Sequence, residues 1–229
     1  MAELAAVVFD LDDTLFDHSG SAARGFGTWL ASFHGPATPE LTAAWFELQD
    51  LHFAAWRDGL VSLAEQRRRR IAGLLELLER PLLDPPGLDA LWADYFTAYR
   101  SGWERFDDAE AALELVAAAG LRTGILTNGP DDLQHDKLAV IGLSGRVGPV
   151  VTAESLGSAK PHPAAYAGLC EALGLDPGAI LYVGDDYELD VVGARAAGLR
   201  AVHLDRHGTG PAGERDRIGS LHDLAARLV

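Results

Sequence analysis

The chain has 229 residues, of which 48% are hydrophobic and 23% charged, and it contains a single cysteine, Cys170. This composition is that of a globular protein with a substantial buried core, and it excludes a disordered chain, a collagen-like repeat and a disulfide scaffold. The formal net charge of -15 disfavours nucleic-acid partners, because a negative surface repels phosphate backbones.

The sequence carries no signal for a membrane or for export. No apolar run reaches the ~20 residues that cross a bilayer, and the start MAELAAVVFD lacks the basic region and cleavage site of a secretory signal. A lone cysteine cannot form an internal disulfide, which is typical of proteins in a reducing compartment. We therefore expect a cytoplasmic protein, either a monomer or a homodimer, with no membrane partner.

Short apolar runs predict the strands of a parallel sheet, because strands that are covered on both faces are apolar throughout. The runs lie at residues 4–9, 121–126, 147–151, 180–183 and 199–204. From residue 107 onward they alternate with helices that we predict over residues 108–119, 161–173 and 187–197, each followed by a glycine. This alternation predicts an α/β fold with a Rossmann-like three-layer core around a parallel sheet.

Residues 17–105 interrupt the alternation. Leucine, alanine and aromatic residues recur there at helical spacing, which predicts four or five helices and no strand. We therefore expect an inserted all-helical domain over residues 17–105, and a core domain formed by residues 1–16 and 106–229. The aromatic residues of the insert are expected to form its hydrophobic core, and the arginine run at 67–70 a solvated helix surface.

Polar residues follow three of the predicted strands. Asp10 and Asp12 follow the first, Thr127 and Asn128 end the second, and an acidic group at Asp185, Asp186 and Asp190 follows the strand at 180–183. In open α/β sheets the reacting groups lie just beyond the carboxyl ends of the strands, so we expect these side chains to converge. Asp186 has the alternative role of a helix cap, which does not apply to Asp10 and Asp12.

Such a group of carboxylates predicts a divalent cation. Like charges about 4 Å apart repel by roughly 4 kcal/mol at an effective dielectric constant of 20, so the cluster must protonate, separate or bind a metal. Oxygen ligands without histidine or cysteine favour Mg²⁺ over zinc.

The segments FDLDDTL, LTNG, SAKPHPAAY and VGDDYELD resemble, in order and spacing, the four motifs of the haloacid dehalogenase-like hydrolase superfamily. The insert resembles the helical cap domain of one subclass. The resemblance implies that Asp10 is a nucleophile that becomes an aspartyl-phosphate, and that Asp12 is first the general acid and then the general base. It further implies Mg²⁺ held by Asp10, Asp185 and the backbone carbonyl of Asp12.

The same resemblance assigns the supporting residues. Thr127 and Asn128 would bind phosphate, and Lys160, expected at a helix start before Pro161, would offset the charge of Asp10 and of the phosphate. Asp190 would act through water or hold Lys160. Asp186 and Thr14 are expected to support these groups without binding the substrate or the metal themselves. Thr14 is equally compatible with a turn residue. Lys137, in the segment LQHDKLAVIGL, is expected on the solvent face of an amphipathic helix.

Asp12 also favours one chemistry within the superfamily. Haloacid dehalogenases lack an aspartate at this position, because a halide leaves without a proton. Phosphonate hydrolases need a cap lysine, and the insert contains none. We therefore expect a phosphatase acting on a small phosphorylated metabolite, such as a sugar phosphate or a nucleoside monophosphate. A phosphomutase and a catalytically idle phospho-ligand-binding regulator remain alternatives.

Overall fold

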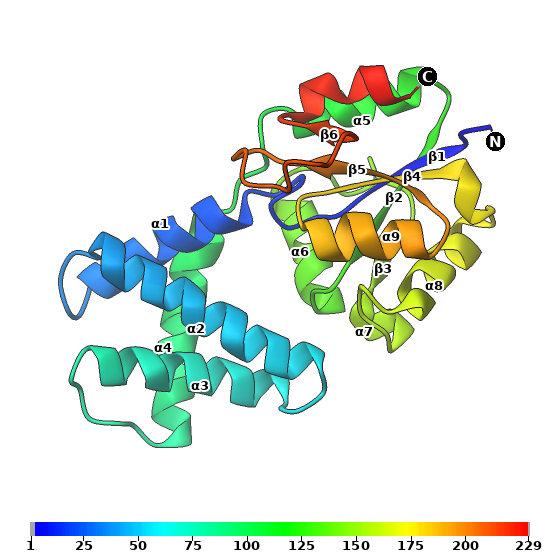
Figure 1. Cartoon of the computed structure of the whole chain (residues 1–229). Coiled ribbons are helices and arrows are strands. Elements are labelled where there is room, and N and C mark those ends of the chain that lie inside the picture. Colours follow the sequence, from blue (N-terminus) through cyan, green and yellow to red (C-terminus); the bar gives the residue numbers. More distant parts are fainter. Residues whose placement is uncertain (1–2, 229) are drawn as a thin grey trace. The chain divides into compact units, whose positions relative to one another are not determined.

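In the computed structural model, which describes residues 3–228, the chain divides into two units (Figure 1). One consists of Met1–His18 and Glu104–Val229, and the other of Ser19–Trp103. The two junctions lie close to the limits expected for the insert at residues 17 and 105. Residues 1, 2 and 229 of the expected core domain lie outside the described residues.

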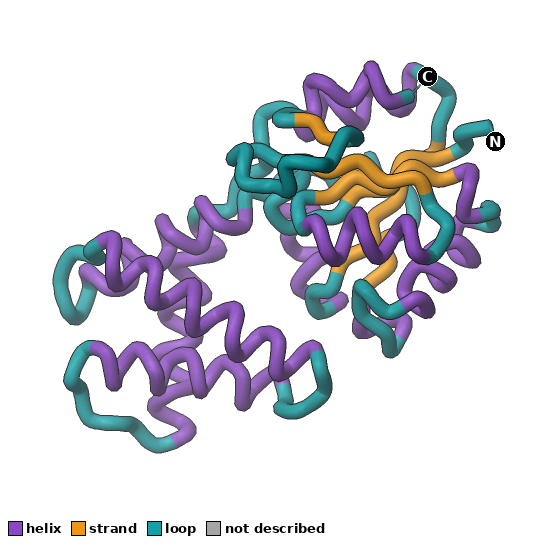
Figure 2. The backbone as a smooth tube through the Cα atoms, in the orientation of Figure 1, coloured by secondary structure: helices purple, strands orange, loops and turns teal. Residues whose placement is uncertain are grey.

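The first unit contains the expected parallel sheet (Figure 2). Within residues 3–228 it has six strands in the order β3-β2-β1-β4-β5-β6, all parallel to their neighbours. The strands are β1 (Ala6–Phe9), β2 (Arg122–Thr127), β3 (Val150–Thr152), β4 (Ile180–Gly184), β5 (Arg200–Leu204) and β6 (Arg217–Ile218). The last of these was not predicted, because two residues are too few to show a pattern.

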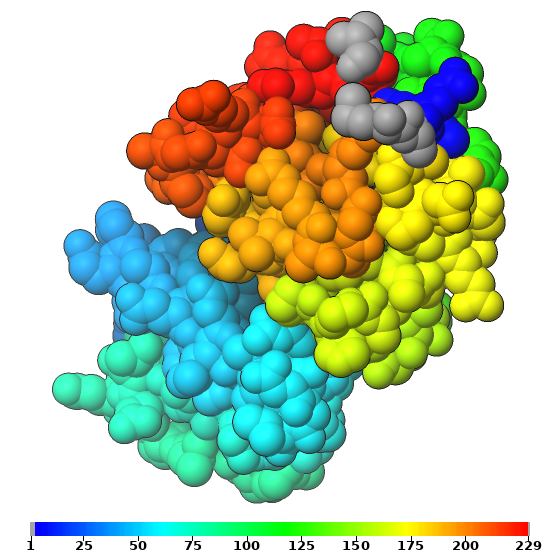
Figure 3. Space-filling model, turned by 45° about the vertical axis from the view of Figure 1, so that its right-hand side comes forward, coloured from blue at the N-terminus to red at the C-terminus, as the bar shows by residue number. Residues whose placement is uncertain are grey.

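Helices cover both faces of this sheet, which confirms the three-layer architecture. On one face, α8 (Pro163–Leu173) and α9 (Gly193–Ala196) pack on a core that includes Val8, Tyr166 and Tyr182. In the space-filling view the chain from α8 to α9 forms one continuous surface, coloured yellow to orange (Figure 3). On the other face, α5 (Ala109–Ala118) packs against β2 and against η3 (Leu221–Arg227).

Shorter helices connect the remaining elements. They are α6 (Asp131–Val140), α7 (Ala153–Leu156), η1 (Pro177–Ala179) and η2 (Tyr187–Val192). The single helix expected over 187–197 is divided into the wide π-helical turn η2 and the α-helical turn α9. Asp190 lies in the wide turn, and its buried carboxylate faces the protein interior.

The strand register determines where the site lies. Phe9, the last residue of β1, pairs with Ile125 of β2 and with Val183 of β4. The residues that follow these three strands therefore leave the sheet at the same level. The strand order also reverses at β1, and α/β sheets bind ligands beside such a reversal.

The second unit is helical throughout, as predicted. It contains α1 (His18–Ala31), which begins at the junction, α2 (Pro39–Arg57), α3 (Leu63–Leu77) and α4 (Pro85–Ser101). The last three helices are each preceded by a residue whose side chain accepts a hydrogen bond from the first turn: Thr38, Ser62 and Asp84.

Aromatic side chains form the core of the helical unit, as expected. Trp45 is fully buried, stacks on Phe26 with ring centroids 5.2 Å apart and meets Tyr95 edge-on at 4.8 Å. The expectation of a solvated arginine run is wrong for Arg70, whose guanidinium lies 4.4 Å from the centre of the Trp45 ring. Arg70 is buried because it shares an i, i+4 stripe of α3 with Leu74.

None of the helices in the described part of the chain combines the length and the hydropathy that a membrane span requires.

Candidate active site

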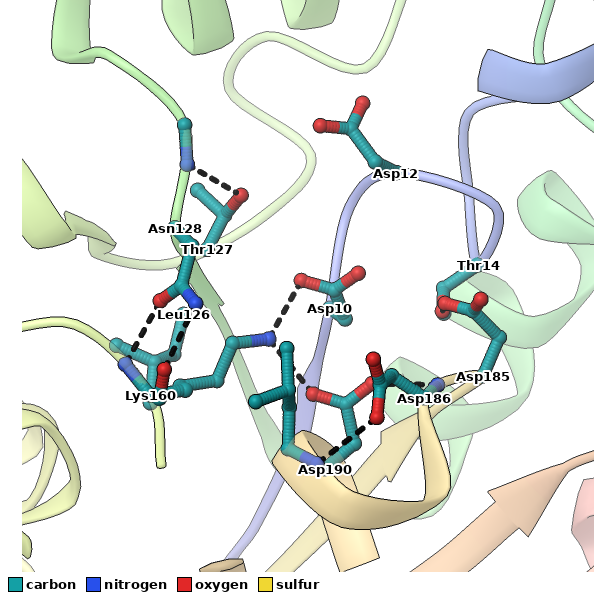
Figure 4. A network of polar contacts seen from close by, with 12 residues as sticks. Asp10, Asp12, Thr14, Leu126, Thr127, Asn128, Lys160, Asp185, Asp186 and Asp190 are labelled. Carbon is teal, nitrogen blue, oxygen red and sulfur yellow. Dashed lines mark hydrogen bonds and ion pairs between the residues drawn. The ribbon is translucent and has the colours of Figure 1, made fainter. Parts of the chain in front are cut away.

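Polar side chains from three strand ends meet at the carboxyl edge of the sheet (Figure 4). Asp10 follows β1, Thr127 ends β2, and Asp185 follows β4. Carboxylate oxygens of Asp10, Asp185 and Asp190 lie within 4.8 Å of one another. The predicted convergence is therefore present for these three carboxylates, whereas Asp12 and Asp186 lie outside the cluster.

Asp10 is held in the centre of the site. Its main-chain N–H donates to the carbonyl of Val183 at 2.9 Å, and its Oδ1 accepts a hydrogen bond from Lys160 Nζ at 2.8 Å. Burial raises the pKa of Asp10 to about 7, with Lys160 acting in the opposite direction and the nearby carboxylates adding to the rise. Burial and the neighbouring carboxylates thus favour the protonated form of Asp10, and the Lys160 ammonium group only partly offsets them.

Lys160 has all three of its N–H donors engaged. Its Nζ lies 2.8 Å from Asp10 Oδ1, 2.6 Å from Asp190 Oδ1 and 2.9 Å from the Tyr182 hydroxyl. That hydroxyl donates to the carbonyl of Leu126, so it accepts from the lysine. Burial alone would lower the pKa of Lys160, but the charges of Asp10 and Asp190 outweigh it and raise the pKa well above the usual value.

The sequence predicts Lys160 at the start of a helix, and this prediction is wrong. Helix α8 begins at Pro163, and His162 precedes it as the N-cap, with its ring Nδ1 accepting from Ala164 N at 3.2 Å. Lys160 lies in the turn before this cap. The helix dipole of α8 therefore does not act directly on the ammonium group, because that effect is confined to the first turn.

Asn128 uses its side chain to hold the Lys160 turn. The main-chain N–H of Lys160 donates to Asn128 Oδ1 at 2.7 Å, and Asn128 Nδ2 donates to the carbonyl of Lys160 at 2.9 Å. The Asn128 side chain therefore bonds to both main-chain polar groups of Lys160.

Thr127 is oriented as a hydrogen-bond donor. Its Oγ1 accepts from Gln134 Nε2 at 2.6 Å and from the main chain of Gly129 at 3.4 Å. A hydroxyl has two lone pairs and one proton, so with both lone pairs engaged it acts toward a ligand through its proton.

Asp12 points away from Asp10 in Figure 4, toward two residues of α6. Lys137 Nζ donates to its Oδ1 at 2.6 Å, and Gln134 Nε2 donates to its Oδ2 at 3.2 Å. Burial would raise the pKa of Asp12, but Lys137 and, to a smaller extent, His18 lower it below its ordinary value.

The expectation that Lys137 lies on a solvent face is wrong. Its side chain is 2% exposed, because Asp12 and the Phe16 ring, 5.0 Å away, surround its ammonium group. Gln134 was not predicted either, and no sequence signal marks it. For Lys137 one signal was available: the chain contains only two lysines, and both lie in this site.

Asp185 is held by its neighbours on either side. The buried Thr14 hydroxyl donates to Asp185 Oδ1 at 3.2 Å, and His203 Nε2 lies 3.0 Å from the Asp185 carbonyl oxygen. Burial, together with the charges of Asp10 and Asp190, raises the pKa of Asp185 to about 9. His203, at the end of β5, carries no sequence signal that distinguishes it from the other histidines.

The last two acidic residues have different environments. Asp186 caps η2, with its Oδ1 accepting from Leu189 N at 2.9 Å, and it lies outside the carboxylate cluster. Asp190 is buried, and its two oxygens accept from Lys160 Nζ and from Asp186 N. Asp190 is thus tied both to Lys160 and to the main chain at the start of η2.

These donors fit a hard divalent cation. The cluster offers carboxylate oxygens from Asp10, Asp185 and Asp190, which suit Mg²⁺ better than zinc. Burial and the neighbouring carboxylates raise the pKa values of Asp10 and Asp185, and a bound cation would favour the ionised forms of both.

Comparisons with known proteins identify the family of the chain. Residues 4–198 match the haloacid dehalogenase-like hydrolase family. The phosphoserine phosphatase of Thermus thermophilus is 36% identical over 135 residues, which are 58% of this chain but only 54% of that protein. Phosphatase MT3486 of Mycobacterium tuberculosis is 30% identical over 226 residues, covering 97% of this chain and 94% of that protein.

A solved structure shows the same fold over the whole chain. The putative HAD-hydrolase YfnB of Bacillus subtilis, determined with bound magnesium, superposes with a TM-score of 0.85 over 99% of each chain at 21% identity. With the family match spanning most of the sequence, the chain belongs to the haloacid dehalogenase-like hydrolases.

Proposed function

We propose that this phosphatase hydrolyses a small phosphomonoester in two steps, through a phosphorylated Asp10 and with Mg²⁺ at the carboxylate cluster. One observation carries the proposal: each of the paired carboxylates is bonded to a different buried lysine. Lys160 contacts Asp10 at 2.8 Å and Lys137 contacts Asp12 at 2.6 Å. The two aspartates therefore stand in separate environments, as a nucleophile and an acid–base group require.

In the first step a carboxylate oxygen of Asp10 attacks phosphorus, and the bond from phosphorus to the ester oxygen breaks. Asp12, a carboxylate in the free protein, takes up a proton from water when substrate binds and passes it to the leaving alkoxide. Attacking and leaving oxygens lie roughly in line in phosphoryl transfer. The orientation of Asp12 away from Asp10 suits this arrangement, because the leaving oxygen stands on the far side of phosphorus.

In the second step water attacks the phosphorus of the aspartyl-phosphate. Asp12, now a carboxylate, accepts a proton from the water, and the bond between phosphorus and the Asp10 oxygen breaks to release inorganic phosphate. Splitting one displacement into two lets a single carboxyl group give a proton and then take one back.

Three residues support the phosphoryl group. The Thr127 hydroxyl donates its proton and Asn128 its main-chain N–H. Lys160 offsets the charge of Asp10 and of the phosphate from a fixed position, because its donors already have protein acceptors.

Asp10, Asp185 and the main-chain carbonyl of Asp12 would hold Mg²⁺. Thr14 supports Asp185, Asp190 holds Lys160, and Asp186 supports Asp190 through its main-chain N–H. When bound, the ion supplies positive charge that offsets Asp10 and the phosphate oxygens.

We propose a small phosphorylated metabolite as the substrate, in a cytoplasmic setting and with a monomer or homodimer as the active form. A relative named phosphoserine phosphatase supports this substrate class. Asp12 supports ester hydrolysis over dehalogenation, since a departing halide has no use for a proton donor.

The experiment uses the full chain with p-nitrophenyl phosphate and a panel of phosphorylated metabolites. We expect turnover that a chelator abolishes and Mg²⁺ restores. Asp10→Asn should be inactive, whereas Asp132→Asn, an exposed change of the same type on α6, should match the wild type. Acid-quenched wild-type protein should carry one phosphoryl group at Asp10. A protein that is inert across the panel would instead indicate a phospho-ligand-binding regulator.

A further inference from the structure

Helix α6 buries two polar side chains that have no part of their own in the two proposed steps. Lys137 is 2% exposed and Gln134 is fully buried. The two residues lie at positions i and i+3, so they occupy the same face of the helix. Burying a cation and an amide costs free energy unless both form hydrogen bonds, and apolar residues would serve packing alone better.

Together these side chains hold both oxygens of one carboxylate. Lys137 Nζ donates to Asp12 Oδ1 at 2.6 Å, and Gln134 Nε2 donates to Asp12 Oδ2 at 3.2 Å. A carboxylate bonded through both oxygens is restricted in rotamer and in plane. Without these partners the Asp12 side chain, which is 31% exposed, would be free to rotate into solvent.

The same amide links Asp12 to the phosphate-binding end of β2. Gln134 Nε2 also donates to Thr127 Oγ1 at 2.6 Å, so its two N–H groups serve two residues of the site. Its Oε1 is buried without a hydrogen-bond partner among residues 3–228. The hydrogen bonds of the Gln134 side chain are therefore those of its two N–H groups, to Asp12 and to Thr127.

The local sequence makes room for this link. A Cβ atom at position 129 would lie 2.5 Å from Gln134 Cδ, so the glutamine fits only because residue 129 is glycine. On the other side, the Lys137 ammonium packs over the buried Phe16 ring. Both side chains are thus enclosed where they contact Asp12.

We propose that Gln134 and Lys137 are positioning residues for proton transfer, which hold the Asp12 carboxyl group at a fixed place relative to Thr127. This inference rests on the proposed role of Asp12. It assigns to α6 a part in the acid–base step that is separate from metal and phosphate binding. Variants at these positions should therefore reproduce the leaving-group dependence of Asp12 variants.

The test compares β-glycerophosphate, whose alkoxide needs a proton, with p-nitrophenyl phosphate, whose phenolate leaves without one. Lys137→Met should lower kcat on β-glycerophosphate by about 100-fold and on p-nitrophenyl phosphate by about tenfold or less. Gln134→Met should show the same selectivity with a smaller loss. His135→Gln, an exposed change on the same helix, should leave both rates unchanged.

A double-variant cycle adds a second readout. If Lys137 acts through Asp12, then Asp12→Asn combined with Lys137→Met should be no slower than Asp12→Asn alone, within about twofold. Equal losses on both substrates, or losses that multiply in the double variant, would overturn the inference.

Thermal unfolding of each variant identifies any that fails to fold. If Lys137→Met does not fold, the same kinetic comparison is made with Lys137→Gln and Gln134→Met. The two levels of the proposal fail in different ways. Turnover by Asp10→Asn would contradict the proposed function. Inactive Asp10→Asn and Asp12→Asn alongside wild-type rates for Lys137→Met and Gln134→Met would contradict only the positioning role.

Discussion

The side-chain amide of Asn128 and the main chain of Lys160 exchange two hydrogen bonds, of 2.7 and 2.9 Å. This pair joins the end of β2 to a turn 32 residues later in the chain. It fixes the position of the Lys160 main chain relative to the end of β2, and therefore the point from which the lysine side chain extends into the site. Asn128 thus uses its side chain to hold the main chain of Lys160.

We predict that Asn128→Ala lowers both stability and activity. Two buried main-chain groups of Lys160 lose their partners, which should cost about 1–3 kcal/mol in the free energy of unfolding. Because the lysine also loses its fixed position, kcat should fall on both test substrates. Urea denaturation and steady-state kinetics measure the two effects. A loss of stability with wild-type kcat would show that the pair serves the fold alone.

The Tyr182 hydroxyl is the third acceptor of Lys160, and Tyr182→Phe removes it. One N–H of a buried ammonium is then left without a partner, so we expect kcat to fall about tenfold, equivalent to ~1.4 kcal/mol. Tyr166→Phe is the matched control, since its hydroxyl donates to the carbonyl of Leu189. Equal rates for the two variants would argue against a role for Tyr182 in holding the lysine.

The carboxylate cluster predicts that Mg²⁺ stabilises the protein more at high pH than at low pH. Burial raises the folded-state pKa of Asp10 to about 7 and of Asp185 to about 9, above the ordinary value of 3.8. An acid with a raised pKa holds its proton more tightly when folded. Its contribution to stability is therefore complete below about pH 4 and is lost as the pH rises through the folded-state value.

Calorimetry with chelator and with Mg²⁺, at several pH values between about 5 and 9, measures this dependence. The metal-induced rise in Tm should grow with pH, and it should shrink strongly in Asp185→Asn. At a Mg²⁺ concentration about 100 times Kd the stabilisation should reach about 2.7 kcal/mol. A rise in Tm that does not change with pH would contradict a site built on these two carboxylates.

Gly129→Ala should damage the site through Gln134. The added Cβ would stand 2.5 Å from Gln134 Cδ, so the glutamine must move and give up its bonds to Thr127 and Asp12. We expect a loss of kcat of the same size and selectivity as in Gln134→Met. Combining Gly129→Ala with Gln134→Ala should add little to Gln134→Ala alone. If the double variant is instead much slower, the glycine matters for another reason, such as the main-chain path toward phosphate.

The strand-end aspartates could be predicted from the sequence because their signal is local. An apolar run that stops at Asp10, and another that stops before Asp185, place both residues at one edge of a parallel sheet whatever the details of packing. The place of Lys160 depended on a motif resemblance. Its neighbouring helix was predicted to begin too early, because Pro161 and Pro163 are equally suited to a first turn and only the bond from Ala164 N to His162 distinguishes them.

Residues whose role depends on contacts between distant elements could not be found in this way. Lys137 has the spacing of a solvent-facing helix position, and it is buried because Asp12 and Phe16, far earlier in the chain, lie against it. Arg70 is misjudged for the same reason, since the Trp45 ring that covers it belongs to another helix. A helical pattern records which face a residue occupies, but not whether a partner on that face compensates its charge.

The burial of both lysines leaves the chain without an exposed ε-amino group, since Lys137 and Lys160 are only 2% and 3% exposed. Reagents that acylate or cross-link lysine should consequently find neither side chain on the native protein, and both on the unfolded one. Lysine labelling followed by peptide mapping therefore measures the fraction of molecules in which the surroundings of these two lysines have unfolded.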